Sequence, residues 1–379
     1  MSDKKFKRTD LQLHLYSESL RHNVKALKSC CTAKVKFCAV VKSNAYGHGI
    51  TNVVNILKDA GVDFFAVANI YEAFHIIDLV DKQKILILEP VYVSEAKDLL
   101  LRAAQLGIHW TIDSIESAKY VESVLAGSWL KLNVHIYIDC GMSRGGVAPA
   151  NAAKLAEFIN GSKNITLAGI YTHFATADEK DLSFALERLE VFMNTVEAMD
   201  NLLGKDVLVH AANSSATMRI PQAHFDMVRC GIAIYGYSTL PRPLPVELRP
   251  ALKLCAPIVH ITTIEKGKTV SYGRTFTAEH EMKIAVLAIG YSDGFRRRYS
   301  NKTELMLNGK KAPVIGRVTM NEIILDITNI PDARTGQMVT VIDNEIESPC
   351  GVYTLAGKLE TICYEVLTSV PPWVNTIVE

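Results

Sequence analysis

The sequence predicts an α/β protein with an N-terminal (β/α)8 barrel of the TIM type and a C-terminal, mainly-β domain. Two observations predict this fold. Between Val35 and about Tyr235, eight short apolar runs alternate with longer amphipathic stretches, and eight βα units are the number that closes a parallel barrel. Beyond residue 240 the expected strands are short and are separated by turn residues, which is typical of an all-β unit.

The apolar runs give the expected barrel strands. They are Val35–Val41, Phe64–Val67, Ile85–Leu88, Ile108–Thr111, Leu132–Ile138, Leu167–Tyr171, Val207–His210 and Asp226–Arg229. Most are separated by 12 or more residues with the spacing of an amphipathic helix. The clearest predicted helix is Asp178–Met199, in which Leu189, Phe192 and Val196 recur three and four residues apart.

A proline-rich segment separates the two predicted domains. Pro241, Pro243, Pro245 and Pro250 break any regular element there. We therefore expect a barrel domain in residues 1–240 and a β domain in residues 241–379. The expected strands of the β domain are Ile258–Ile264, Thr269–Tyr272, Lys283–Ala288, Leu305–Leu307, Pro313–Ile315, Ile323–Ile327 and Met338–Ile342.

The composition argues against several classes of protein. The 379 residues include 41 basic and 40 acidic side chains, and a net charge of +1 gives no reason to expect nucleic acid or an anionic membrane as a partner. The charged N-terminus MSDKKFKRTD does not resemble a signal peptide, and no segment approaches the roughly 18 apolar residues of a membrane helix. The eight cysteines lack metal-ligand spacing. We expect a cytoplasmic protein with reduced thiols and no metal site.

Five residues with chemically useful side chains lie at or beyond the carboxyl ends of predicted barrel strands: Lys42, Arg144, His173, Ser214 and Arg229. Ligands of parallel barrels bind at the carboxyl ends of the strands, so we expect these residues to share one site. A lysine at this place is partly desolvated, which lowers its pKa and favours formation of a Schiff base. On the residues alone, Lys42 also fits a strand-end lysine that extends into solvent, and His173 fits a buried core residue.

Several sequence blocks together carry a resemblance to a known family. They are K-x-x-A-Y-G-H-G at 42–49, YIDCGMSRGGV at 137–147, YTHFATADE at 171–179, HAANSSAT at 210–217, MVRCGIAIYG at 227–236, VSYGRTF at 270–276, AIGYSDGF at 288–295, VIGRVTMNE at 314–322 and TICYEVL at 361–367. In this order they resemble the blocks of the alanine racemase family, and the resemblance extends from near Leu11 to Leu367.

The resemblance implies a pyridoxal 5′-phosphate enzyme that interconverts L- and D-alanine, supplies D-alanine for peptidoglycan and forms a homodimer with shared active sites. It implies that Lys42 binds the cofactor and is the base on one face of the substrate, whereas Tyr272 of the other subunit is the base on the opposite face. Racemisation requires such a pair, because a proton removed from one face returns from the other. A phenol has a pKa near 10, so Arg144 and His173 are the groups available to lower that of Tyr272.

The resemblance places Arg229 at the ring nitrogen of the cofactor and His173 beside the ring. Arginine remains protonated and cannot give up its proton, so the ring nitrogen would stay neutral. A neutral ring is a weaker electron sink, which favours reprotonation of the substrate at Cα over transamination. An ion pair between Arg229 and Asp226 is the alternative that the sequence leaves open.

The other implied site residues form three sets. The phosphate of the cofactor would be bound by the side chains of Tyr46, Ser214 and Tyr364 and by the backbone amides of Gly231 and Ile232. The substrate carboxylate would be bound by Arg144 and by the backbone amide of Met320. The entry corridor would be lined by Asp178, Tyr291, Arg297 and Arg317. Each corridor residue also fits an ordinary solvated side chain, and Asp178 fits a helix N-cap.

The sequence departs from the family pattern at several positions. Tyr137 stands where many members have a lysine that becomes carbamylated, and its phenol should be neutral near pH 7. Arg144 therefore needs another partner, for which a bound anion such as chloride is one candidate, whereas Asp139 is a weaker one if it anchors the following turn. Thr319 and Asn321 replace the usual cysteine and aspartate, and the ending TSVPPWVNTIVE lacks the family's arginine.

Three alternative functions remain open at this point. A racemase of broader specificity, or one that prefers serine, fits the same blocks, because pockets reject an added hydroxyl poorly. A non-catalytic pyridoxal-phosphate carrier has the same barrel, although such proteins lack the β domain and the opposing tyrosine. A barrel enzyme that does not use this cofactor is the third.

Overall fold

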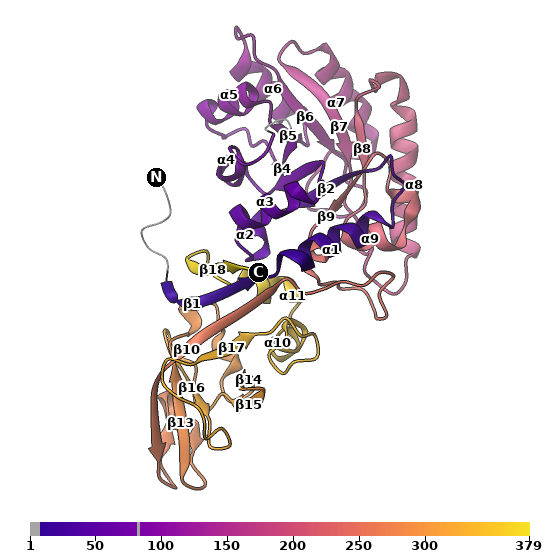
Figure 1. Cartoon of the computed structure of the whole chain (residues 1–379). Coiled ribbons are helices and arrows are strands. Elements are labelled where there is room, and N and C mark those ends of the chain that lie inside the picture. The colour runs from indigo at the N-terminus through magenta and orange to yellow at the C-terminus, as the bar shows by residue number, and fades with distance from the viewer. Residues whose placement is uncertain (1–7, 82–83) are drawn as a thin grey trace.

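A computed structural model describes residues 8–81 and 84–379. Figure 1 shows a barrel surrounded by helices and, below it, a β domain that extends away from the barrel. The predicted combination of a TIM-type barrel with a mainly-β domain is therefore confirmed. Residues 1–7, which belong to the charged segment that argued against a signal peptide, lie outside the described residues.

The barrel sheet contains eight parallel strands in the order β8-β7-β6-β5-β4-β3-β2-β9. They are β2 (Lys36–Val40), β3 (Phe64–Val67), β4 (Ile85–Pro90), β5 (His109–Ile112), β6 (Leu132–Tyr137), β7 (Ile165–Tyr171), β8 (Leu208–His210) and β9 (Met227–Cys230). The edge strands β8 and β9 are joined by hydrogen bonds from Asp226 N to Val209 O (3.0 Å) and from Arg229 N to Ala212 O (2.9 Å). All eight predicted strands are present, with ends within two residues of the predicted ones.

Helices cover the outside of the barrel. They are α1 (Ser17–Lys28), α3 (Ile50–Asp59), α4 (Ile70–Ile76), α5 (Lys97–Leu106), α6 (Ile115–Leu125), α7 (Pro149–Gly161), α8 (Ser183–Ala198) and the short α9 (Ser214–Arg219). Helix α8 was predicted to begin at Asp178 but begins at Ser183, whose amide donates to Asp181 Oδ1 (2.9 Å). Asp178 is therefore not a helix N-cap. None of the helices in the described part of the chain has the length and apolar character that a membrane crossing requires.

The main sheet of the β domain has the strand order β15-β14-β17-β10-β1-β18; β13 also pairs with β10, β16 pairs with β13, and β11 and β12 form a separate two-stranded sheet. The strands of the domain are β1 (Arg8–Leu15), β10 (Leu252–Ile264), β11 (Thr269–Val270), β12 (Phe276–Thr277), β13 (Met282–Leu287), β14 (Glu304–Leu307), β15 (Lys310–Pro313), β16 (Ile323–Asp326), β17 (Met338–Ile342) and β18 (Val374–Val378), with helices α10 (Val352–Leu359) and α11 (Cys363–Thr368). The first and last strands of the chain, β1 and β18, pair with each other and were not predicted.

Two features of this sheet differ from expectation. Strand β1 precedes the barrel in sequence, yet it pairs with β10, so residues 8–15 belong structurally to the β domain rather than to the barrel. The strand expected at Pro313–Ile315 is β15, which starts earlier, at Lys310. The reason is the turn at Asn308 and Gly309, whose φ angles of 52° and 71° are those of a tight hairpin connection that fixes the register.

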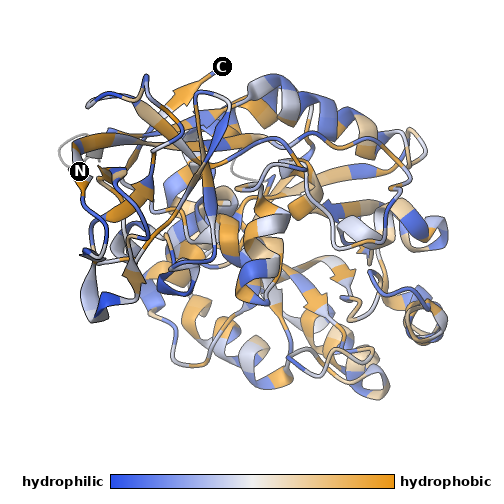
Figure 2. Ribbon diagram, turned by 90° about the horizontal axis from the view of Figure 1, so that it is seen from below, coloured by the Kyte–Doolittle hydropathy of each residue, from blue (hydrophilic) through white to orange (hydrophobic). Residues whose placement is uncertain are grey.

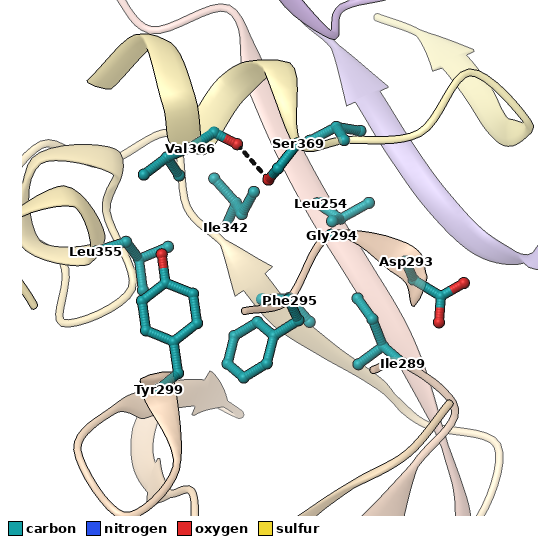
Figure 3. Close-up of a pocket in the computed structure, with 12 residues that line it drawn as sticks. Leu254, Ile289, Asp293, Gly294, Phe295, Tyr299, Ile342, Leu355, Val366 and Ser369 are labelled. Carbon is teal, nitrogen blue, oxygen red and sulfur yellow. Dashed lines mark hydrogen bonds between the residues drawn. The ribbon is translucent and has the colours of Figure 1, made fainter. Parts of the chain in front are cut away.

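Apolar side chains concentrate on the strands, which are mostly orange in Figure 2. The buried Asn23 of α1 connects the barrel to the proline-rich linker. Its Nδ2 donates to Ile234 O (2.9 Å) and Arg249 O (2.8 Å), and its Oδ1 accepts from Arg249 N (2.8 Å). A small cavity in the β domain is lined mainly by apolar side chains such as Ile289, Phe295 and Leu355 (Figure 3). Its free volume of about 10 Å³ holds about one water at most, so it is not a ligand site.

Candidate functional site

Lys42 lies directly beyond the carboxyl end of β2, at the start of an unusual turn, α2 (Lys42–Tyr46). The four residues after Lys42 have φ between 52° and 54°, so this turn is left-handed although none of them is glycine. Each such residue costs about 1–2 kcal/mol. Glu72 of α4 braces the turn, because its carboxylate accepts hydrogen bonds from Ser43 N (2.7 Å) and Ala68 N (2.8 Å). Backbone strain of this kind is typical of functional sites.

The surroundings of Lys42 favour its neutral, nucleophilic form. Its side chain is half-buried, and desolvation and then the charge of Arg144 lower the pKa of Lys42 below its ordinary value. The carboxylates of Glu72 and Glu89 oppose this shift without cancelling it. This is the environment that covalent catalysis by a lysine requires.

Arg229, at the carboxyl end of β9, is buried and has no acidic partner among the residues that the structure describes. Its Nη1 contacts His210 Nδ1 (2.9 Å), and its Nη2 donates to Thr172 O (2.7 Å) and Ala211 O (3.2 Å). The alternative of an ion pair with Asp226 is wrong, since Asp226 Oδ2 instead accepts from the amide of Val209 (2.8 Å). Burial lowers the pKa of Arg229, but the group remains a hydrogen-bond donor only.

His173 lies among the cations of the site. Its Nδ1 is 3.4 Å from Arg229 Nη2. Burial lowers the pKa of His173 to about 3, and the nearby charges of Arg229, Arg144 and Lys42 act in the same direction. The imidazole is therefore neutral near pH 7. The positive charges of Arg229 and Arg144 beside a neutral histidine favour an anionic ligand at this site.

The residues predicted to bind phosphate come together on neighbouring loops. Ser214 Oγ accepts a hydrogen bond from the amide of Gly231 (2.9 Å), and Ile232 follows at the start of a short 3₁₀ turn. The ring of Tyr46 lies 5.9 Å from that of Tyr364. A Cβ at Gly231 would lie only 2.4 Å from Tyr46 Oη, so only glycine lets this phenol approach the backbone so closely. Hydroxyl and amide donors thus converge on one place.

Asp178 is half-buried on the barrel side of the site. Burial is the main cause that raises the pKa of the Tyr364 phenol, and the negative charge of Asp178 acts in the same direction. Asp178 therefore lies close to the predicted phosphate-binding residues. Glu72 and His210 were not predicted as site residues, although His210 begins the block HAANSSAT at 210–217.

Arg144 lies in the loop after β6 and is exposed in the single chain. Asp139 anchors this loop, because its Oδ1 accepts from the amides of Gly141 (2.9 Å), Met142 (2.9 Å) and Ser143 (3.0 Å). In the described part of the chain, no carboxylate forms an ion pair with Arg144. Asp139 therefore anchors the turn, which is the role predicted for it as the alternative to pairing with Arg144.

Tyr137, the departure next to this loop, is buried and its ring stacks on that of Tyr171, with centroids 4.8 Å apart and planes 7° apart. Burial raises the pKa of Tyr137, which agrees with the predicted neutral phenol, while the charge of Arg144 opposes that shift. Its Oη has no hydrogen-bond partner among the described residues. The stacked ring therefore fills the space of the missing lysine without supplying its negative charge.

The remaining predicted residues lie on the β domain. Tyr272 is 72% exposed and Met320 is 55% exposed, although both have predicted roles in contact with substrate. Their loops are joined through Ser271 Oγ, which donates to Arg317 O (2.6 Å). Arg297 and Arg317 line one shallow basic concavity. Tyr291 N donates to Thr319 O (3.0 Å), next to Met320.

The predicted site is thus divided in two within one chain. One half is at the carboxyl ends of the barrel strands and the other is on the exposed surface of the β domain. Among the described residues, no hydrogen bond or ring contact joins Tyr272 to Lys42, Arg229 or His173.

The fold and the barrel half of the site define a class: a two-domain α/β-barrel protein with a lysine and an anion-binding cradle at the strand ends. Comparison with known proteins gives the family. The alanine racemase N-terminal domain model matches residues 16–239, and the alanine racemase C-terminal domain model matches residues 251–378. The chain belongs to the alanine racemase family.

Relatives and solved structures agree with this assignment. The chain is 35% identical over 365 residues to the alanine racemase of Chlorobaculum tepidum, which covers 95% of this chain and 93% of that protein. It is 33% identical to the alanine racemase of Methanococcus maripaludis, covering 93% and 94%. The crystal structure of alanine racemase from Bacillus anthracis with bound L-Ala-P matches with a TM-score of 0.89 at 32% identity, covering 98% and 95%.

Proposed function

We propose that this chain is a pyridoxal-phosphate-dependent alanine racemase that interconverts L- and D-alanine as a homodimer. The observation that carries the proposal is the combination of Lys42, with its lowered pKa, and an anion-binding cradle at the same end of the barrel. Membership of the alanine racemase family supports the same activity. The product D-alanine would serve peptidoglycan synthesis.

The residues of the barrel site fit pyridoxal phosphate. Tyr46, Ser214 and Tyr364 and the amides of Gly231 and Ile232 would bind its phosphate, which is supported by the close approach of Tyr46 Oη to Gly231. Arg229 would face the ring nitrogen and His173 the ring. When bound, the cofactor supplies an electron sink that stabilises a carbanion at the substrate Cα. Because Arg229 only donates, it leaves the ring nitrogen unprotonated and favours return of the proton to Cα.

Two bases would then move the proton. Lys42 Nζ would act on one face of Cα, and Tyr272 Oη of the other subunit would act on the opposite face. The exposure of Tyr272 and Met320 in the single chain supports a shared site, since a catalytic site excludes water and a second subunit would supply that cover. Arg144 and the amide of Met320 would bind the substrate carboxylate, and Asp178, Tyr291, Arg297 and Arg317 would line the entry.

Racemisation can be tested by incubating the purified protein with single enantiomers of a panel of amino acids, including serine. We expect both alanine enantiomers to be converted to the other with higher kcat/KM than any other pair. A preference for serine would support the alternative specificity, and no conversion despite bound cofactor would support a non-catalytic carrier. Borohydride reduction and peptide mapping should place the pyridoxyl group on Lys42; a label on a different lysine would refute the site.

A further inference from the structure

Three histidines form a hydrogen-bonded series that starts at Arg229 and runs through the barrel interior. Arg229 Nη1 contacts His210 Nδ1 at 2.9 Å. His210 Nε2 is 2.8 Å from His135 Nδ1, and His135 Nε2 is 2.8 Å from His109 Nδ1. The histidines come from strands β8, β6 and β5, so segments far apart in sequence contribute to one chain of bonds.

The direction of every bond in this series follows from its first member. Arginine has hydrogen-bond donors only, so His210 Nδ1 is the acceptor and the single proton of a neutral His210 is on Nε2. That Nε2–H donates to His135 Nδ1, which puts the proton of His135 on Nε2 as well. The same step fixes His109, whose Nδ1 accepts. One guanidinium therefore sets the tautomers of three imidazoles.

The surroundings keep these histidines neutral and in place. His135 and His210 are fully buried, and burial lowers the pKa of both well below the ordinary value, while it lowers that of His109 to about 4. The ring of His210 stacks on Tyr171 with centroids 5.0 Å apart and planes 9° apart. A Cβ at Gly169 would lie 2.3 Å from His135 Nδ1, so this glycine makes the space that the His135 ring occupies.

We infer that His135 and His109 are positioning residues, which act through His210 to hold the guanidinium of Arg229 in one orientation. A lone His210 could rotate or change tautomer, and a change would present Nδ1–H to an arginine that can only donate. His135 prevents this change because its Nδ1 needs the proton of His210 Nε2. The histidine series itself does not depend on the proposed function. Only its consequence does, namely that the oriented guanidinium faces the ring of the cofactor.

The inference makes a sharp prediction for the variant Arg229→Glu. A carboxylate is an acceptor, so His210 would place its proton on Nδ1 to donate to it. His210 Nε2 would then accept from His135 Nδ1–H, and His135 Nε2 would accept from His109 Nδ1–H. All three tautomers should reverse, including that of His109, which is two hydrogen bonds away from the substituted side chain.

The test is nitrogen NMR of the cofactor-free protein labelled with ¹⁵N-histidine. In the unmodified protein, we expect protonated Nε2 and bare Nδ1 on His109, His135 and His210, and the reverse on all three in Arg229→Glu. His224 is an internal control, because its Nε2 contacts Thr217 O at 2.9 Å and should stay protonated in both proteins. A His109 that keeps its tautomer while His210 reverses would overturn the inference, as would Nδ1 protonation in the unmodified protein.

A second variant covers the case in which Arg229→Glu does not fold. Gly169→Ala should displace the His135 ring, so that His210 loses the partner that holds its tautomer, and all three histidines should show mixed tautomers. Unchanged signals from all three histidines would contradict the inferred series.

In the loaded enzyme, His135→Leu should raise the ratio of pyruvate formed to alanine racemised. If the tautomers are as predicted but the protein binds no cofactor, the proposed function is refuted and the histidine series is not. If the His135→Leu enzyme is active and its ratio of pyruvate to racemised alanine is unchanged, the positioning role is refuted.

Discussion

Gly231→Ala should damage both the stability of the protein and its affinity for the cofactor. The added Cβ would lie 2.4 Å from Tyr46 Oη and 3.1 Å from Tyr46 Cζ, against the 3.5–4.0 Å at which carbon contacts are favourable. The Tyr46 side chain has little room to move away, because its ring packs against two others. The ring centroids of Tyr235 and Tyr364 lie 4.9 Å and 5.9 Å from that of Tyr46. Overpacking of this kind costs about 1–3 kcal/mol.

The effect on cofactor binding follows from the displaced phenol. A hydrogen bond to a charged phosphate contributes about 1.5–3 kcal/mol, so its loss should raise the Kd for pyridoxal phosphate roughly 10- to 100-fold. Urea unfolding of the cofactor-free protein measures the first effect, and absorbance titration with the cofactor measures the second. The double variant Gly231→Ala, Tyr46→Phe should recover part of the lost stability, since it removes the clashing oxygen.

Gly357→Ala in α10 is the matched control. The new Cβ meets no atom within 4 Å outside its own helix, so this variant should be stabilised by about 0.5–1 kcal/mol with an unchanged cofactor Kd. If Gly231→Ala were as stable and bound cofactor as tightly as the unmodified protein, the cradle formed by Gly231 and Tyr46 would be disproved.

Three further predictions concern single groups. Burial lowers the pKa of His48 and of His109 to about 4, below the unfolded value of about 6.5, so their stabilising effect is fully present above about pH 6.5 and is lost as the pH falls toward 4. Each should reduce the free energy of unfolding by ~1.4 kcal/mol per pH unit in that window, and the same urea midpoint at about pH 7.5 and about pH 5.5 would contradict this. Because Tyr137 has no amine to carbamylate, racemisation should be independent of added bicarbonate and intact mass should show no carbamate; a bicarbonate requirement would show the opposite. Arg229→Glu should protonate the cofactor ring and raise pyruvate formation relative to racemisation, and an unchanged ratio would remove Arg229 from that role.

Much of the barrel could be predicted because local pattern and global structure agree there. Strands buried on both faces are continuous apolar runs, and each is followed by a helix whose apolar face packs on the sheet. The sequence could not reveal that β1 belongs to the β domain, since its partners β10 and β18 are distant in sequence. The start of α8 was also missed, because the polar residues before Ser183 fit a helix as well as a loop.

In the site, residue identities could be predicted but not the interactions that hold them. The left-handed turn after Lys42 is braced by the hydrogen bond that Ser43 N donates to the Glu72 carboxylate, and no local propensity predicts this long-range contact. The histidine series was missed for a related reason. In the sequence, His135 and His210 each resemble an ordinary core histidine, and only the fold shows that they lie in contact on strands β6 and β8. Likewise, only the geometry shows that Asp226 accepts a hydrogen bond from the Val209 amide and does not pair with Arg229.

The proposed division of the two bases between subunits is tested most directly by mixing two inactive variants. Lys42→Ala and Tyr272→Phe homodimers should each lose racemisation, because every site lacks one base. A heterodimer of the two has one site with Lys42 from one subunit and Tyr272 from the other, so exchange of subunits should restore racemisation at one intact site per heterodimer. If verified heterodimers remained as inactive as the parents, Lys42 and Tyr272 would not form a shared site.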